Sequence, residues 1–146
     1  MSQYFDLGDE TLWNPSNGAS RMFQRHVALH EAELGLPSGI GPMEMDECQI
    51  DPVAFGAFVH ALLARHRRTG HSIVLALSED FTAIALVLAG RAGIEVDWAR
   101  LSAETDGRLE DVQVSAVTGM SEPPDGAAWA AALRARAREL GRRMPR

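Results

Sequence analysis

The sequence predicts a mainly α-helical protein: a compact bundle of about four helices with a small β element after residue 94. Apolar residues recur at helical spacing over several long stretches, and two of these stretches follow a capping residue and a proline. The chain has 146 residues, of which 46% are hydrophobic, so it is long enough for one domain with its own core. We therefore expect a single folded body.

The first helix is predicted to run from Pro15 to Leu34. Asn14 can cap it, and Pro15 suits the first helical position because the N–H that proline lacks has no helical partner there. Gly35 supplies the stop. The apolar residues at roughly helical spacing are Met22, Phe23, Val27, Leu29 and Leu34.

The second helix is predicted to run from Pro52 to Arg68, with Asp51 as its cap and Gly70 just beyond its end. Its wide apolar face consists of Val53, Phe55, Phe58, Val59, Leu62 and Leu63. Between the two helices, residues 43–50 alternate loosely between apolar and polar, which permits either a short strand or an extended connector.

Residues 71–93 allow two interpretations. The first is one long buried helix; the second is a strand at residues 72–77 followed by a helix, which would make the protein α+β with a further strand at residues 94–98. We favour the long helix because no turn residue separates Leu77 from Ser78.

The rest of the chain is expected to form two further segments after a helical core domain at residues 1–93. Residues 94–126 read as a polar connector with possible short strands, of which residues 112–117 are the best candidate. Residues 127–146 read as an amphipathic, arginine-rich helix that Asp125 caps. Its narrow apolar stripe docks either on the protein's own core or on a partner.

Composition indicates a cytoplasmic protein. The chain has no expected export signal and no expected membrane span, and its single cysteine, Cys48, rules out an intramolecular disulfide. Charge is uneven: residues 1–60 carry a net −7 and residues 61–146 a net +1, and every basic residue is arginine. An acidic first half argues against that half lying on nucleic acid.

Three segments are distinctive: Tyr4-Phe-Asp-Leu-Gly-Asp9, Leu12-Trp-Asn-Pro-Ser16 and Asp46-Glu-Cys-Gln-Ile-Asp51. Together with the Phe55-x-x-Phe58-Val59 pattern, they resemble a family of small actinobacterial proteins of unknown function, over about residues 1–93. The resemblance implies a bacterial origin and a helical N-terminal core, and it brings no established activity, ligand or catalytic residue.

A pair of histidines is the main candidate for a metal site. His26 and His30 are four residues apart, which places them on one helix face, and His60, Cys48 or Glu47 would supply a third ligand. A divalent transition metal would be the cofactor of such a site. Against this, their charged neighbours are typical of a solvated helix face. We therefore expect no cofactor.

The acidic cluster Glu44, Asp46, Glu47 and Asp51 matches no calcium loop, and its simplest interpretation is a charged connector with Asp51 as a helix cap. Asp46 and Glu47 remain candidates for contact with a partner. Acidic neighbours raise a thiol pKa, so Cys48 is expected to be a half-buried, inert thiol.

The first functional hypothesis is a non-enzymatic interaction protein, an accessory or immunity-type factor, because the chain lacks a nucleophile elbow, a phosphate-binding loop and a dinucleotide fingerprint. Its partner would be another protein or a second copy. The alternative is a small metal- or ligand-binding enzyme, and a weaker third is nucleic-acid binding by the arginines of the last helix. Besides Asp46 and Glu47, the expected contact residues are Trp129, Leu133, Arg136 and Leu140.

Overall fold

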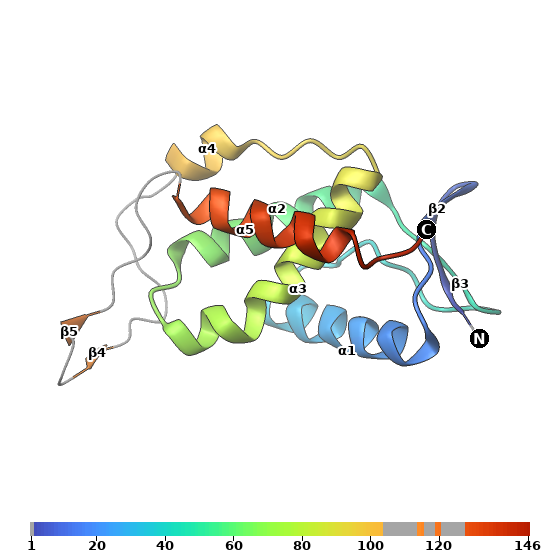
Figure 1. Ribbon diagram of the computed structural model, residues 1–146, viewed down its shortest axis with the longest axis horizontal. Coiled ribbons are helices and arrows are strands. Elements are labelled where there is room, and N and C mark those ends of the chain that lie inside the picture. Colours follow the sequence, from blue (N-terminus) through green and yellow to red (C-terminus); the bar gives the residue numbers. More distant parts are fainter. Residues whose placement is uncertain (1, 104–113, 116–118, 121–127) are drawn as a thin grey trace.

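The structure is a computed structural model that describes residues 2–103, 114–115, 119–120 and 128–146. Within these residues the helices are α1 (Asn17–Leu34), α2 (Pro52–Arg68), α3 (Ser72–Arg91), α4 (Trp98–Ala103) and α5 (Ala128–Gly141). The strands are β1 (Tyr4–Leu7), β2 (Glu10–Trp13), β3 (Glu47–Gln49), β4 (Val114–Ser115) and β5 (Gly119–Met120). The predicted mainly α fold is confirmed, and a small sheet lies at one end of the helices beside both chain termini (Figure 1).

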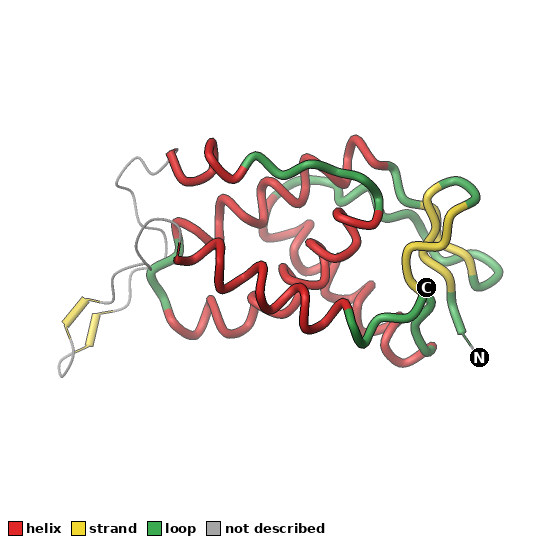
Figure 2. Tube along the Cα trace, turned by 45° about the horizontal axis from the view of Figure 1, so that its top comes forward, coloured by secondary structure: helices red, strands yellow, loops and turns green. Residues whose placement is uncertain are grey.

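This sheet has the strand order β2-β1-β3, with β1 antiparallel to β2 and parallel to β3 (Figure 2). Gly8 turns the chain between β1 and β2 at a φ of +60°, which glycine adopts without strain. The sequence prediction placed its small β element only after residue 94 and so missed β1 and β2, because each has only four residues and a register shift interrupts their pairing. The open question at residues 43–50 is settled by β3, a short strand.

Helix α1 begins two residues later than predicted, because Ser16 rather than Asn14 caps it. The Ser16 hydroxyl accepts a hydrogen bond from the N–H of Ala19 at 3.3 Å. The Asn14 N–H instead donates to the Pro145 carbonyl, 2.9 Å away, and so ties the end of the chain to its beginning. The predicted end is confirmed: Leu34 is the last helical residue, and Gly35 follows at a φ of +63°.

Helix α2 is confirmed at both ends. The Asp51 carboxylate accepts hydrogen bonds from the N–H groups of Val53 and Ala54, at 2.9 and 3.3 Å. Arg68 is the last helical residue, and Thr69 forms the C-cap, one residue before the predicted stop at Gly70.

Helix α3 is one continuous helix, so the alternative of a strand at residues 72–77 is wrong. The Nδ1 atom of His71 caps its start by accepting a hydrogen bond from the Ile73 N–H at 3.2 Å. Ser78, where the alternative placed a new cap, donates its hydroxyl to the Val74 carbonyl at 2.8 Å. A serine that bonds to the preceding turn in this way is compatible with an uninterrupted helix.

Helix α3 packs against both α2 and α5 and is the centre of the core. Among the helices that the structure describes, α3 alone is long and apolar enough to cross a membrane. Core helices of globular proteins can have the same length and composition. The buried residues of α3 all lie from Phe81 onward. The Phe81 ring packs against Phe23, which forms an aromatic cluster with Phe5 and Trp13 of the sheet. This cluster joins the sheet to the helices.

After Gly93 the chain forms a loop and then α4, so no strand is present at residues 94–98. Strand β4 lies inside the strand predicted at residues 112–117, whose other positions are outside the described residues. The predicted cap Asp125 and helix start Ala127 are also outside them. Helix α5 ends at Gly141, so the last five residues of the segment predicted as a helix, 142–146, lie beyond it.

Candidate functional site

The three histidines considered as metal ligands are not gathered at one place. His26 and His30 lie on α1, with ring centroids 6.0 and 4.3 Å from that of Phe81 on α3. His60 lies on α2 beside a shallow depression whose opposite wall includes Leu101 of α4. Across residues 2–103 and 128–146 and the short described segments between them, no group of three or more His, Cys, Asp or Glu side chains is arranged to hold a metal ion.

His30 is a core residue and not part of a solvated helix face. It is 6% exposed, and its ring lies almost parallel to that of Phe81, at an interplanar angle of 8°. Neither ring nitrogen has a hydrogen-bond partner. Burial, together with smaller contributions from His26 and Arg65 and against the opposing charge of Glu33, lowers the pKa of His30 to about 4. His30 is therefore neutral at pH 7.

Cys48 is fully buried in β3, more deeply than the half-buried position expected from the sequence. Its thiol donates a hydrogen bond to the carbonyl of Gly41 at 3.2 Å. Burial raises the pKa of Cys48 to about 11, with a smaller contribution from the Asp6 carboxylate, while the bond to Gly41 lowers it. The protonated, enclosed thiol is unsuited to act as a nucleophile.

The acidic segment before β3 forms a tight two-residue turn. Glu44 and Glu47 exchange backbone hydrogen bonds of 2.8 and 2.9 Å, and Met45 and Asp46 between them have φ values of +49° and +68°. The Asp46 carboxylate accepts a hydrogen bond from the Gln3 amide at 3.1 Å. Asp46 therefore shapes the turn, whereas Glu47 is exposed and Met45 at the tip is 98% exposed.

The apolar stripe of α5 docks on the protein's own core. Trp129 is 2% exposed and Leu133 is 1% exposed, while Leu140 is partly buried against the same core. The Trp129 ring lies 5.8 Å from that of Trp98 in α4, and the guanidinium of Arg134 lies over Trp98 at 5.2 Å. In this structure Trp129 and Leu133 offer almost no surface to a partner.

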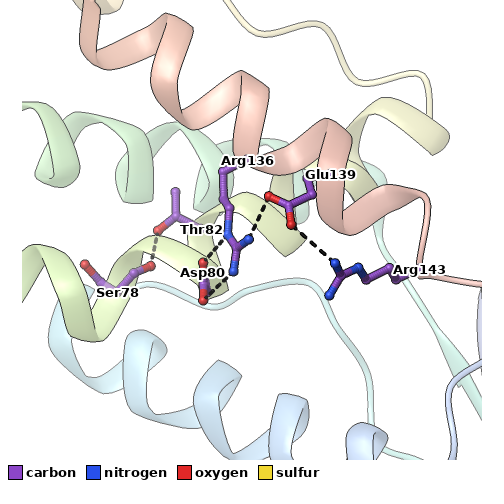
Figure 3. A network of polar contacts seen from close by, with 6 residues as sticks. All are labelled: Ser78, Asp80, Thr82, Arg136, Glu139 and Arg143. Atoms are coloured by element: carbon purple, nitrogen blue, oxygen red, sulfur yellow. Dashed lines mark hydrogen bonds and ion pairs between the residues drawn. The ribbon is translucent and has the colours of Figure 1, made fainter.

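Arg136 is held by an intramolecular network that fastens α5 to α3 (Figure 3). Its guanidinium donates two hydrogen bonds to the Asp80 carboxylate, at 2.7 and 3.1 Å, and one to Glu139 at 2.9 Å. These contacts hold the pKa of Asp80 below its ordinary value and raise that of Arg136. Glu139 also pairs with Arg143 at 3.5 Å, on the exposed side of α5.

A groove runs between α3 and α5, and other arginines of the C-terminal segment line it. Its larger part has a volume of about 510 Å³, and an adjoining part of about 310 Å³ extends toward Trp98. The floor of the larger part consists of Leu86, Val87, Gly90, Ala137 and Gly141. Its rim consists of Arg91, Arg138, Arg142 and Arg146.

Arg91 closes one end of the groove and has a structural role. Its guanidinium donates hydrogen bonds to the carbonyls of Leu12, Gly141 and Met144, at 2.6, 3.1 and 2.8 Å. It thereby places a positive charge at the C-terminal end of α5, where the helix dipole favours one. Burial lowers the pKa of Arg91, as does the charge of Arg146.

Two of the rim arginines are left without a counter-charge. Arg146 pairs with Glu10 at 2.9 Å. Arg138 and Arg142 have no ion-pair or hydrogen-bond partner in the part of the chain that the structure describes. Arg138 lies in the last turn of α5 and Arg142 directly follows the end of the helix at Gly141; both line the same groove, so two like charges lie there without a counter-charge, a mildly unfavourable arrangement.

Sequence reasoning identified these arginines as a basic series but not the groove beneath them. The floor combines residues of α3 and α5, which are about fifty positions apart, so no local pattern reveals it. The available signal was small residues, Ala137 and Gly141, on the same helix side as Arg138 and Arg142.

No curated protein and no solved structure matches the chain. A family of unknown function, DUF6086, matches residues 1–146, so the similarity extends over the whole chain and beyond the segment of about residues 1–93 in which it was recognised. The chain belongs to this family of unknown function.

Proposed function

We propose that the protein is a non-enzymatic protein-interaction factor of the bacterial cytoplasm, accessory or immunity-type, and that its partner binds in the α3–α5 groove. One observation carries the proposal: an apolar floor lies under two arginines, Arg138 and Arg142, that have no partner among the described residues. The apolar stripe of α5, whose residues were candidates for partner contact, packs on the protein's own core. The surface that remains for a partner is the side of α5 that carries the groove and its arginines.

The chemistry of the groove specifies the partner. Apolar side chains would cover Leu86 and Val87, and carboxylates would pair with Arg138 and Arg142. An amphipathic helix with one apolar and one acidic face meets both requirements, as in other helix-in-groove complexes. The opposite charges would speed association and select against basic segments.

The first test uses a synthetic helical peptide of about 18 residues, or five turns, with leucines on one face and glutamates on the other. Fluorescence anisotropy of the labelled peptide measures binding, and a second peptide with lysine in place of glutamate serves as the reference. We expect the protein to bind the acidic peptide at least about tenfold more tightly, a difference of about 1.4 kcal/mol.

The double variant Arg138→Glu, Arg142→Glu should lose that preference. The matched comparison is between two single variants, Arg142→Glu in the groove and Arg143→Glu outside it: each reverses one charge just after α5, and only Arg143→Glu should bind as the unaltered protein does. Thermal unfolding by circular dichroism checks that each variant is folded. Equal binding of the two peptides, or an equal loss in the Arg143 variant, would refute the proposal.

A DNA duplex tests the nucleic-acid hypothesis in the same assay. We expect no saturable binding at about 150 mM salt, because Arg138 and Arg142 supply only two positive charges for the phosphates and the protein as a whole has a net charge of −6. Tight, salt-dependent binding of the duplex that the double variant abolishes would replace the proposed protein partner by a nucleic acid.

A further inference from the structure

A second groove, of about 550 Å³, lies on α1 and the segment before β1, away from the α3–α5 groove. It is lined by the guanidiniums of two arginines and by three side-chain amides. These residues are Arg21, Arg25, Gln3, Asn17 and Gln24. This volume is within the usual range for a small-molecule site. Its polar side chains include amides as well as guanidiniums, whereas those of the larger part of the α3–α5 groove are guanidiniums alone, which points to a different class of ligand.

Arg21 and Arg25 are the only basic residues among the first 60, which also carry nine acids. They lie four residues apart on α1, at a spacing where two like charges repel. Despite the surrounding acids, neither guanidinium has an ion-pair or hydrogen-bond partner in residues 2–103 or the other described segments. An anion shared between them would turn this repulsion into two charge-assisted hydrogen bonds.

The amides of the groove are held in place by neighbouring side chains. The Gln3 Nε2 donates to the Asp46 carboxylate at 3.1 Å. The Gln24 Nε2 donates to the Ser20 hydroxyl at 3.0 Å. Each amide nitrogen has a second N–H for a ligand oxygen. These contacts make the wall ready to donate hydrogen bonds without rearrangement.

The Oδ1 atom of Asn17 gives a second requirement. This oxygen is buried and has no hydrogen-bond partner, which is unfavourable for a polar atom. The enclosed oxygen becomes available to a ligand when the Asn17 side chain turns toward the groove, and since it can only accept, the ligand must bring an N–H or O–H to it. A bare anion satisfies the arginines and leaves Asn17 unsatisfied.

We infer that the α1 groove binds a small molecule with an oxyanion, phosphate or carboxylate, that Arg21 and Arg25 share, and with a nearby N–H or O–H that donates to Asn17. Ala28 and Met43 supply the apolar part of the groove and would contact the carbon skeleton of the ligand. The site lies on another element from the partner groove, so it stands or falls independently of the proposed function.

Three probes separate the sources of the oxyanion: sulfate, which is a bare anion, phosphoethanolamine, which carries a phosphate beside an N–H and no carboxylate, and N-acetylglycine, which carries a carboxylate beside an N–H. Binding is followed by two-dimensional ¹H–¹⁵N NMR, in which the side-chain signals of Arg21 and Arg25 report contact directly. N-acetylglycinamide, which keeps the N–H and carries no oxyanion, is the reference ligand. We expect phosphoethanolamine, N-acetylglycine or both to bind at least about tenfold more tightly than N-acetylglycinamide.

Variants at exposed or half-exposed positions test the roles of the residues without disturbing the core. Arg21→Gln with Arg25→Gln should abolish binding of every probe, while Arg143→Gln and the Arg138/Arg142 double variant should leave it unchanged. Asn17→Ala should weaken the probes that carry a donor and leave sulfate, which carries no proton at neutral pH, unaffected. The inference is overturned if no probe shifts the two arginine signals, or if the Arg143 control loses binding as well.

Discussion

Acid should unfold this protein through His30. The ring of His30 is 6% exposed and lies 4.3 Å from that of Phe81, where α1 meets α3. Both ring nitrogens lack a partner, so a proton added there creates an unsolvated charge next to an aromatic face, with Arg65 and His26 nearby. The charged form is much less favourable in the folded chain than in water.

The sign and size follow from the two pKa values of His30, 6.5 ordinarily and about 4 in the fold. Between these pH values the unfolded chain binds the proton and the folded chain does not, so lowering the pH favours unfolding. The stabilisation is complete above pH 6.5 and is lost as the pH falls toward 4, by about 3 kcal/mol at 1.36 kcal/mol per pH unit. Burial lowers the pKa of His66 too, which adds to the loss in the same direction.

Urea unfolding followed by circular dichroism, at pH 7 and at pH 4, measures this loss. The variant His30→Phe keeps an aromatic ring against Phe81 and cannot take a proton, so its free energy of unfolding should fall by about 3 kcal/mol less than that of the unaltered protein. His30→Leu provides a second non-titrating side chain in case Phe does not fit. The reasoning is refuted if all three proteins lose the same free energy between the two pH values.

Three further predictions concern the core and the backbone. Leu133→Ala removes a side chain that is 1% exposed and should lower the free energy of unfolding by about 2–5 kcal/mol in urea titrations; a loss below about 1 kcal/mol would show that α5 is not docked as described. Cys48 should resist Ellman's reagent at pH 8 until denaturant is added, because its pKa is about 11 and it is buried, and fast labelling of the folded protein would contradict this. Gly39→Ala should lower the melting temperature much more than Gly8→Ala: both glycines have positive φ, but only at Gly39 would the new Cβ lie 2.7 Å from a backbone atom, the carbonyl oxygen of Asp51, and equal losses would refute this.

The sequence predicted those elements whose signals are local and redundant. Helix α2 has a capping residue, a proline and a wide apolar face, and all three agree. Helix α3 was favoured because nothing breaks it near Ser78, and that serine does bond back into the helix. Strands β1 and β2 escaped prediction because four residues with a shifted register show too little alternation.

The candidate sites were less accessible to sequence reasoning. His30 looked solvated because Arg25, Glu31 and Glu33 flank it, yet its own position on α1 faces α3. The stripe of α5 was correctly identified, but a stripe alone does not say whether it docks on its own chain or on another. Both grooves depend on residues that are distant in sequence, so they became visible only once the helices were placed together.

The most direct test of the central claim is to map the acidic peptide onto the protein by amide NMR, using glycines as reporters in a well-separated part of the spectrum. Gly90 and Gly141 line the α3–α5 groove, whereas Gly8 and Gly18 lie in the β1–β2 turn and in α1. We predict that the amide signals of Gly90 and Gly141 move during the titration while those of Gly8 and Gly18 stay in place. Signals of Gly90 and Gly141 that stay unmoved at saturating peptide would contradict the account.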